Sequence, residues 1–155
     1  MLTFKEYEVI IGIDTGTKTG LAIYTNCNGE KRMQLLTKPI HVALMKVAEI
    51  SRQYSKVLVR FEDARKRTWF GANAYAKQPG AGSVKRDAVI WEDFLTDLKK
   101  ECAREGSTLD FEAVAPKDNI TKMSPQYFKL LTGCETTASE HARDAAGLVI
   151  RTGVI

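Results

Sequence analysis

An apolar run that ends abruptly in a carboxylate sets the strongest limit on the architecture of this chain. Residues 9–13 read Val-Ile-Ile-Gly-Ile and are followed at once by Asp14. Such a run of β-branched residues is typical of a strand that is buried on both faces. Because an ionised carboxylate is costly to bury, we expect Asp14 to lie at the strand end, where it is paired or holds a cation.

The remaining hydrophobic patterns predict one α/β domain over residues 1–155 with the order βββαβαβα, not counting a short helix before the last one. We expect a five-stranded mixed sheet, its first three strands antiparallel, flanked by helices. Asn26-Cys-Asn-Gly29 is a hairpin signal between the second and third strands, because Asn and Gly tolerate positive φ. The predicted strands span residues 7–14, 21–24, 31–37, 56–62 and 109–114, and the predicted helices residues 39–51, 83–104, 124–131 and 137–151.

Length and composition exclude several classes of protein. The 155 residues fit one domain, which leaves no room for the duplicated domain of an actin-like ATPase. No secretory signal and no apolar run long enough for a membrane helix is present, and the three widely spaced cysteines argue against structural zinc. We expect a cytoplasmic protein with reduced thiols, no organic cofactor and no membrane partner.

The net charge of +4 is concentrated in one segment, residues 64–86. This segment holds six basic and no acidic residues, so 17 basic and 19 acidic residues remain elsewhere. It also contains aromatic residues and Gly and Pro punctuators, as in a flexible loop. Phosphate contact with base stacking on nucleic acid is one interpretation, and a solvated basic loop is the other. The expected DNA contacts here are Arg65, Lys66, Arg67, Trp69, Phe70, Lys77, Lys85 and Arg86.

The predicted helix over residues 83–104 has one apolar stripe at alternating spacings of four and three residues. Ser83 can cap it, and the Pro and Gly residues before it favour a loop there. Ile90 and Phe94 lie outside the stripe. Their positions indicate either a wide core face or a helix that also contacts a partner subunit.

Further acidic residues are candidates for catalysis or metal binding. Glu62 ends the apolar strand of residues 56–62 and precedes Asp63, and strand alternation sends the two carboxylates to opposite faces. We favour Glu62 for a site shared with Asp14, because Asp63 lies on the face of Phe61. In the last helix, His141 and Asp144 are three residues apart and project from one face. We expect this helix to start at a capping box formed by Thr137 and Glu140.

Carboxylates from separate elements suit hard divalent cations such as Mg²⁺. Two such ions can activate a water and stabilise the leaving 3′ oxygen of a phosphodiester. Asp14, Glu62 and Asp144, with His141, are the residues from which we would build such a site.

Three blocks of the sequence resemble the active-site blocks of RuvC-type Holliday-junction resolvases: residues 12–20 (Gly-Ile-Asp-Thr-Gly-Thr-Lys-Thr-Gly), 61–62 and 140–146. The resemblance implies an RNase H-like fold and covers nearly the whole chain. It makes Asp14, Glu62, His141 and Asp144 the catalytic, metal-binding residues, with His141 as a ligand or proton-transfer group. Residues 62–71 and 80–87 resemble divergent, phage-like members.

The resemblance further implies a bacterial or phage-encoded endonuclease that uses Mg²⁺ or Mn²⁺ to cut four-way or other branched DNA. It implies a homodimer formed through the 83–104 helix. Lys117 and Lys122 lie in a connection that is basic in the family, so we expect them either to contact the DNA backbone or to be solvated. The alternatives are a nuclease for flaps or RNA–DNA hybrids and a non-catalytic nucleic-acid-binding module.

Overall fold

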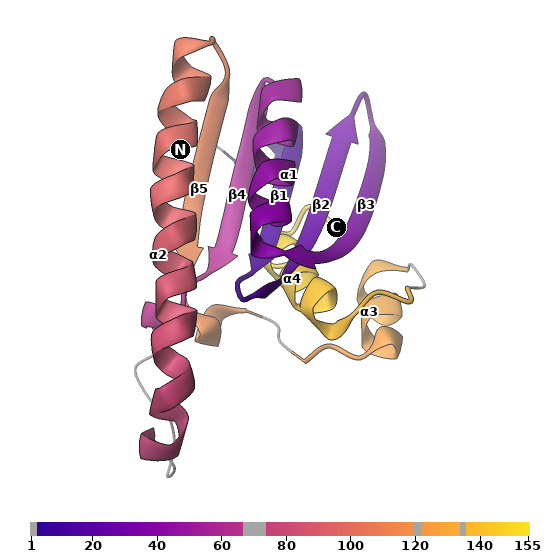
Figure 1. Ribbon diagram of the computed structural model, residues 1–155. Helices are drawn as coiled ribbons and strands as arrows, with labels where there is room; N and C mark the ends of the chain where they lie inside the picture. The colour runs from indigo at the N-terminus through magenta and orange to yellow at the C-terminus, as the bar shows by residue number, and fades with distance from the viewer. Residues whose placement is uncertain (1–2, 67–73, 120–121, 134–135) are drawn as a thin grey trace.

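A mixed sheet with the strand order β3-β2-β1-β4-β5 forms the centre of the molecule (Figure 1). The structure, a computed structural model, describes residues 3–66, 74–119, 122–133 and 136–155. β1–β2 and β2–β3 pair antiparallel, whereas β1–β4 and β4–β5 pair parallel, which confirms the predicted five-stranded mixed sheet. The elements are η1 Phe4–Glu6, β1 Val9–Asp14, β2 Lys18–Cys27, β3 Glu30–Pro39, α1 Ile40–Gln53, β4 Lys56–Glu62, η2 Ala64–Lys66, α2 Ala74–Arg104, β5 Thr108–Val114, η3 Pro116–Asp118, α3 Pro125–Thr132 and α4 Glu140–Ile150.

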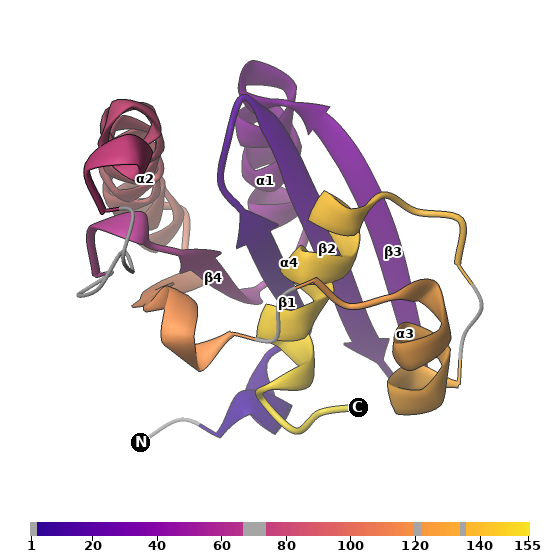
Figure 2. The same ribbon diagram turned by 90° about the horizontal axis from the view of Figure 1, so that it is seen from below.

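Helices cover both faces of the sheet (Figure 2). α1 and α2 pack against one face, where alternate residues of β1 and β4 such as Ile11 and Val59 are fully buried. α4 packs against the opposite face, which contributes Ile10 and Leu58. The strand alternation therefore assigns Asp14 and Glu62, which are in register with Ile10 and Leu58, to the face covered by α4.

Local sequence signals explain most element boundaries. Asn28 and Gly29 have φ values of 55° and 83° and form the expected two-residue hairpin turn between β2 and β3. Gly133 ends α3 with φ 76°, and Ser124 caps its start. Pro39 is the last residue of β3 and the N-cap of α1, so the helix begins at Ile40, one position after the start that the sequence predicted.

The start of α2 differs from the prediction. The helix begins at Ala74 instead of Ser83, so most of the expected flexible loop is helical. Pro79 and Gly80 suggested a loop, but the preceding Ala-Tyr-Ala-Lys-Gln segment is made mainly of good helix formers and continues through them. With 31 residues, α2 is about 46 Å long. Its N-terminal half extends past the carboxyl ends of the parallel strands (Figure 1).

The start of α4 was also predicted wrongly. Thr137 does not cap the helix; Ser139 does, and its Oγ accepts a hydrogen bond from the backbone N–H of Ala142. The preceding segment stays outside the helix because the side chain of Thr136 binds the N–H of Ala138, whose carbonyl accepts from Arg143. Glu140 is therefore the first helical residue and not part of a capping box.

None of the helices in the described part of the chain is both long enough and apolar enough to cross a membrane.

Candidate metal centre and nucleic-acid interface

Two glycines in the sheet let α4 lie directly on the strands. A Cβ added to Gly12 in β1 would come within 2.1 Å of the carbonyl oxygen of Ala145, and one added to Gly20 in β2 within 2.0 Å of that of His141. Both distances are too short for any side chain. The backbone of α4 therefore touches the sheet at these two points, and this contact sets the height of the helix over the end of β1.

Asp14 and His141 meet across this contact. Asp14 is the last residue of β1 and its side chain is 16% exposed, while His141 lies in the first turn of α4. Nδ1 of His141 is 3.0 Å from Oδ2 of Asp14, within hydrogen-bond distance. Strand end and helix start thus bring together two residues that are 127 positions apart in the chain.

Glu62 reaches the same region from the end of β4. Its Oε2 accepts a hydrogen bond of 2.9 Å from Nδ2 of Asn119, and the same Nδ2 is 3.3 Å from the backbone carbonyl oxygen of Asp144. The negative charge of Glu62 also contributes to the raised pKa of Asp14. The structure therefore places Glu62 on the side of Asp14 and α4, as strand alternation predicted.

Asp144 is buried in α4 and is held by the chain segment that follows η3. Its Oδ1 accepts the backbone N–H of Lys122 at 2.7 Å, and Lys122 adopts a positive φ of 55°. Burial raises the pKa of Asp144, while hydrogen bonds from the N–H groups of Lys122 and Met123 oppose the rise. The side chain of Lys122 is exposed.

The electrostatics of Asp14 reflect this convergence of carboxylates. Burial is the main cause that raises the pKa of Asp14, and the charges of Glu62 and Asp144 add to it. The hydrogen bond and charge of His141 oppose the rise, and the resulting pKa is about 7. The carboxylates of Glu62 in β4 and Asp144 in α4 are thus both close enough to Asp14 in β1 for their charges to act on it. A site of this kind favours binding either protons or a cation.

The donor set has the chemistry for a hard divalent cation. Within the described ranges, no three His, Cys, Asp or Glu side chains are already arranged to hold one ion. Instead each carboxylate is held by a neighbour: Asp14 by His141, Glu62 by Asn119 and Asp144 by the backbone of Lys122. Among the described residues, the buried Oδ1 of Asn119 has no hydrogen-bond partner. Carboxylate oxygens and an imidazole nitrogen fit Mg²⁺ or Mn²⁺.

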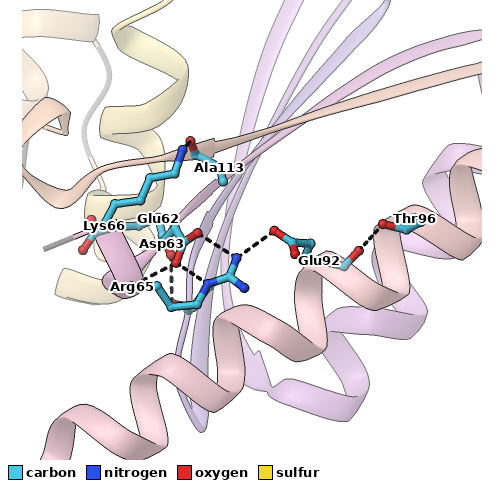
Figure 3. A network of polar contacts seen from close by, with 8 residues as sticks. Glu62, Asp63, Arg65, Lys66, Glu92, Thr96 and Ala113 are labelled. Carbon is cyan, nitrogen blue, oxygen red and sulfur yellow. Dashed lines mark hydrogen bonds and ion pairs between the residues drawn. The ribbon is translucent and has the colours of Figure 1, made fainter.

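On the other face of β4, Asp63 forms a separate ion-pair network (Figure 3). Asp63 is buried, and its two oxygens accept hydrogen bonds of 2.9 and 2.8 Å from the guanidinium of Arg65. Arg65 also binds Glu92 in α2 at 2.7 Å. These bonds to Arg65 lower the pKa of Asp63. The network joins the turn after β4 to α2.

The residues predicted to contact DNA therefore differ in whether their side chains are exposed or already bound within the protein. Arg65 is engaged within the protein, and Nζ of Lys66 donates to the carbonyl oxygen of Ala113 at 2.7 Å. Lys85 and Arg86 are exposed on α2. Arg67, Trp69 and Phe70 lie outside the described residues, as do the side chains of Lys77 and Lys117.

Sequence reasoning missed Asn119 and the partners of Arg65. Because β5 runs parallel to β4, the chain leaving β5 must pass the edge where Glu62 lies. A polar residue in that connection was the available signal for Asn119. Glu92 gave no comparable signal, because its contact depends on how α2 crosses the turn after β4.

The chain matches no protein-family model, and a search of curated proteins found no significantly similar sequence.

Proposed function

We propose that this protein is an RNase H-like, metal-dependent endonuclease of the Holliday-junction resolvase type, which cuts four-way or other branched DNA. The observation that carries the proposal is the convergence of Asp14, Glu62 and Asp144 at one end of the sheet, where burial and mutual repulsion raise the pKa of Asp14. A site that concentrates negative charge in this way gains most from a bound divalent cation.

Each residue has a role that follows from its position. Asp14, Glu62 and Asp144 would supply carboxylate oxygens to Mg²⁺ or Mn²⁺, with His141 as a further ligand. The bound cation supplies positive charge at the phosphodiester and lowers the pKa of water. His141 is 53% exposed and its Nδ1 is engaged by Asp14 at 3.0 Å. A proton would therefore pass between Nδ1 and the Asp14 carboxylate, and between the ring and solvent at Nε2.

The basic surface of α2 gives DNA a route to this site. The N-terminal half of α2 extends beyond the sheet at the end where β1 and β4 finish (Figure 1). Arg86 on this helix is 66% exposed in its side chain, and Lys85 lies beside it. Contacts of such residues with phosphates bind DNA without regard to its sequence.

The direct test is cleavage of labelled four-way DNA by the purified protein, with and without Mg²⁺. We expect cleavage only with the cation, and Asp14→Asn should retain binding while losing cleavage. Flap and RNA–DNA hybrid substrates in the same assay decide the substrate class. Binding of branched DNA without cleavage in Mg²⁺ or Mn²⁺ would instead indicate a non-catalytic binding module.

We also propose a homodimer formed through the 83–104 part of α2, since two sites related by a twofold axis can cut opposing strands. Val89 and Ile90 are 41% and 37% exposed on this helix. Ile90→Lys should shift sedimentation from dimer to monomer. Ala103→Lys, which adds the same charge to an exposed position on the other flank of the buried stripe, should not. A parent that sediments as a monomer at all concentrations refutes the dimer.

A further inference from the structure

Asn119 is the residue that links the two halves of the carboxylate site. It follows η3 in the connection between β5 and α3 and is 8% exposed. Its side-chain amide donates from one nitrogen to two acceptors, Oε2 of Glu62 in β4 and the backbone carbonyl oxygen of Asp144 in α4. One side chain therefore spans the strand and the helix that carry two of the three carboxylates.

This asparagine is not explained by stability alone. In the part of the chain that the structure describes, its buried Oδ1 has no partner, and an unsatisfied buried acceptor costs about 1–3 kcal/mol. A leucine, whose side chain branches at the same position, would avoid that cost. A buried polar side chain with one unsatisfied atom calls for a reason other than packing.

The bonds of Asn119 explain what the side chain does for its neighbours. The bond to Oε2 restricts the orientation of Glu62, and the bond to the carbonyl of Asp144 ties that orientation to α4. Groups that orient metal ligands in this way commonly change metal affinity or activity by about 10–100-fold when removed.

We propose that Asn119 is a positioning residue of the cation site, which holds Glu62 and Asp144 in the relative placement that a divalent cation needs. The inference rests on the proposed metal-dependent function. It differs from a purely structural role, in which Asn119 would only anchor the connection before α3 to α4.

Mn²⁺ binding measured by calorimetry separates these roles. Asn119→Leu removes the amide and also the unsatisfied oxygen. We expect it to bind Mn²⁺ about 10–100-fold more weakly than the parent. Its free energy of unfolding without cation should change little, because the loss of the hydrogen bonds to Glu62 and Asp144 offsets the removal of the unsatisfied oxygen. If Asn119→Leu does not fold, Asn119→Ala removes the same amide, fills less space and carries the same expectation for Mn²⁺ affinity.

Ser51→Ala is the matched control, because it removes another buried hydrogen bond, from Oγ of Ser51 to the carbonyl of Val47 in α1. This control should lose stability and keep its Mn²⁺ affinity. Parent-like Mn²⁺ affinity in the Asn119 variants, or an equal loss of affinity in Ser51→Ala, overturns the positioning role alone. A parent protein that binds no Mn²⁺ and cuts no DNA overturns the proposed function and this inference together.

Discussion

Replacing Asp14 by Asn should make the protein more stable at high pH. Burial raises the pKa of Asp14 from 3.8 to about 7 in the folded protein. The folded state therefore binds a proton more tightly than the unfolded state, and the free energy of unfolding falls as the pH rises through the interval between these values. A difference of this size corresponds to about 4 kcal/mol when the carboxyl group is fully ionised.

The asparagine side chain has nearly the same shape and carries no charge. In the absence of divalent cations, we expect Asp14→Asn and the parent to have equal free energies of unfolding near pH 4. At pH 8 the variant should be more stable, by up to about 4 kcal/mol. Urea unfolding in the presence of a chelator, followed by tryptophan fluorescence from pH 4 to 8, measures this difference.

Asp63→Asn is a control with the opposite sign. Arg65 lowers the pKa of Asp63, so the contribution of Asp63 to stability is present above the ordinary aspartate pKa and is lost as the pH falls. This variant should be less stable than the parent at pH 8, and its stability should approach that of the parent in acid.

Mg²⁺ should stabilise the parent and leave the stability of Asp14→Asn nearly unchanged. Parallel pH curves for the parent and Asp14→Asn, or a less stable Asp14→Asn at pH 8, would refute the reasoning.

Two further predictions concern the support of the site. Gly20→Ala places a Cβ against a backbone carbonyl of α4, so it should lower the free energy of unfolding by about 3 kcal/mol or more and abolish Mn²⁺ binding. Gly82→Ala, in open space on α2, should raise the free energy of unfolding by about 0.5–1 kcal/mol. Equal unfolding midpoints for the two variants would contradict this. Arg65→Ala leaves a buried carboxylate unpaired and should cost about 3 kcal/mol, whereas Arg86→Ala should be nearly neutral for stability and flatten the salt dependence of DNA binding. Denaturation and a salt titration test this pair, and the reverse ranking would make Arg65 the DNA contact.

The sheet could be predicted because its signals are local. The β-branched run of β1, the alternation in β5 and the Asn28-Gly29 turn each depend on residues within one element. The start of α2 could not be predicted in the same way, because Pro79 and Gly80 are loop signals that the surrounding helix formers override. The prediction for the start of α4 was wrong for a similar reason, since Ser139 and Thr137 are both acceptable N-caps by sequence.

The candidate site was predictable where strand and helix periodicity decide the direction of a side chain. Asp14 and Glu62 lie at the ends of parallel neighbouring strands, and His141 shares a helix with Asp144. The role of Asn119 depends on the path of an irregular connection, for which no periodic pattern exists. Contacts of that kind follow from tertiary structure alone.

Glu62 and Asp63 show how adjacent carboxylates acquire opposite properties. Alternation sends Asp63 toward α2, where the guanidinium of Arg65 neutralises it within the protein. Glu62 faces α4 together with Asp14 and receives an amide hydrogen bond from Asn119. An amide orients a carboxylate without cancelling its charge. Besides burial, the charges of Glu62 and Asp144 raise the pKa of Asp14, and a divalent cation bound there would relieve this repulsion. The removal of the Asp14 charge is therefore expected to stabilise the fold without cation while abolishing cleavage.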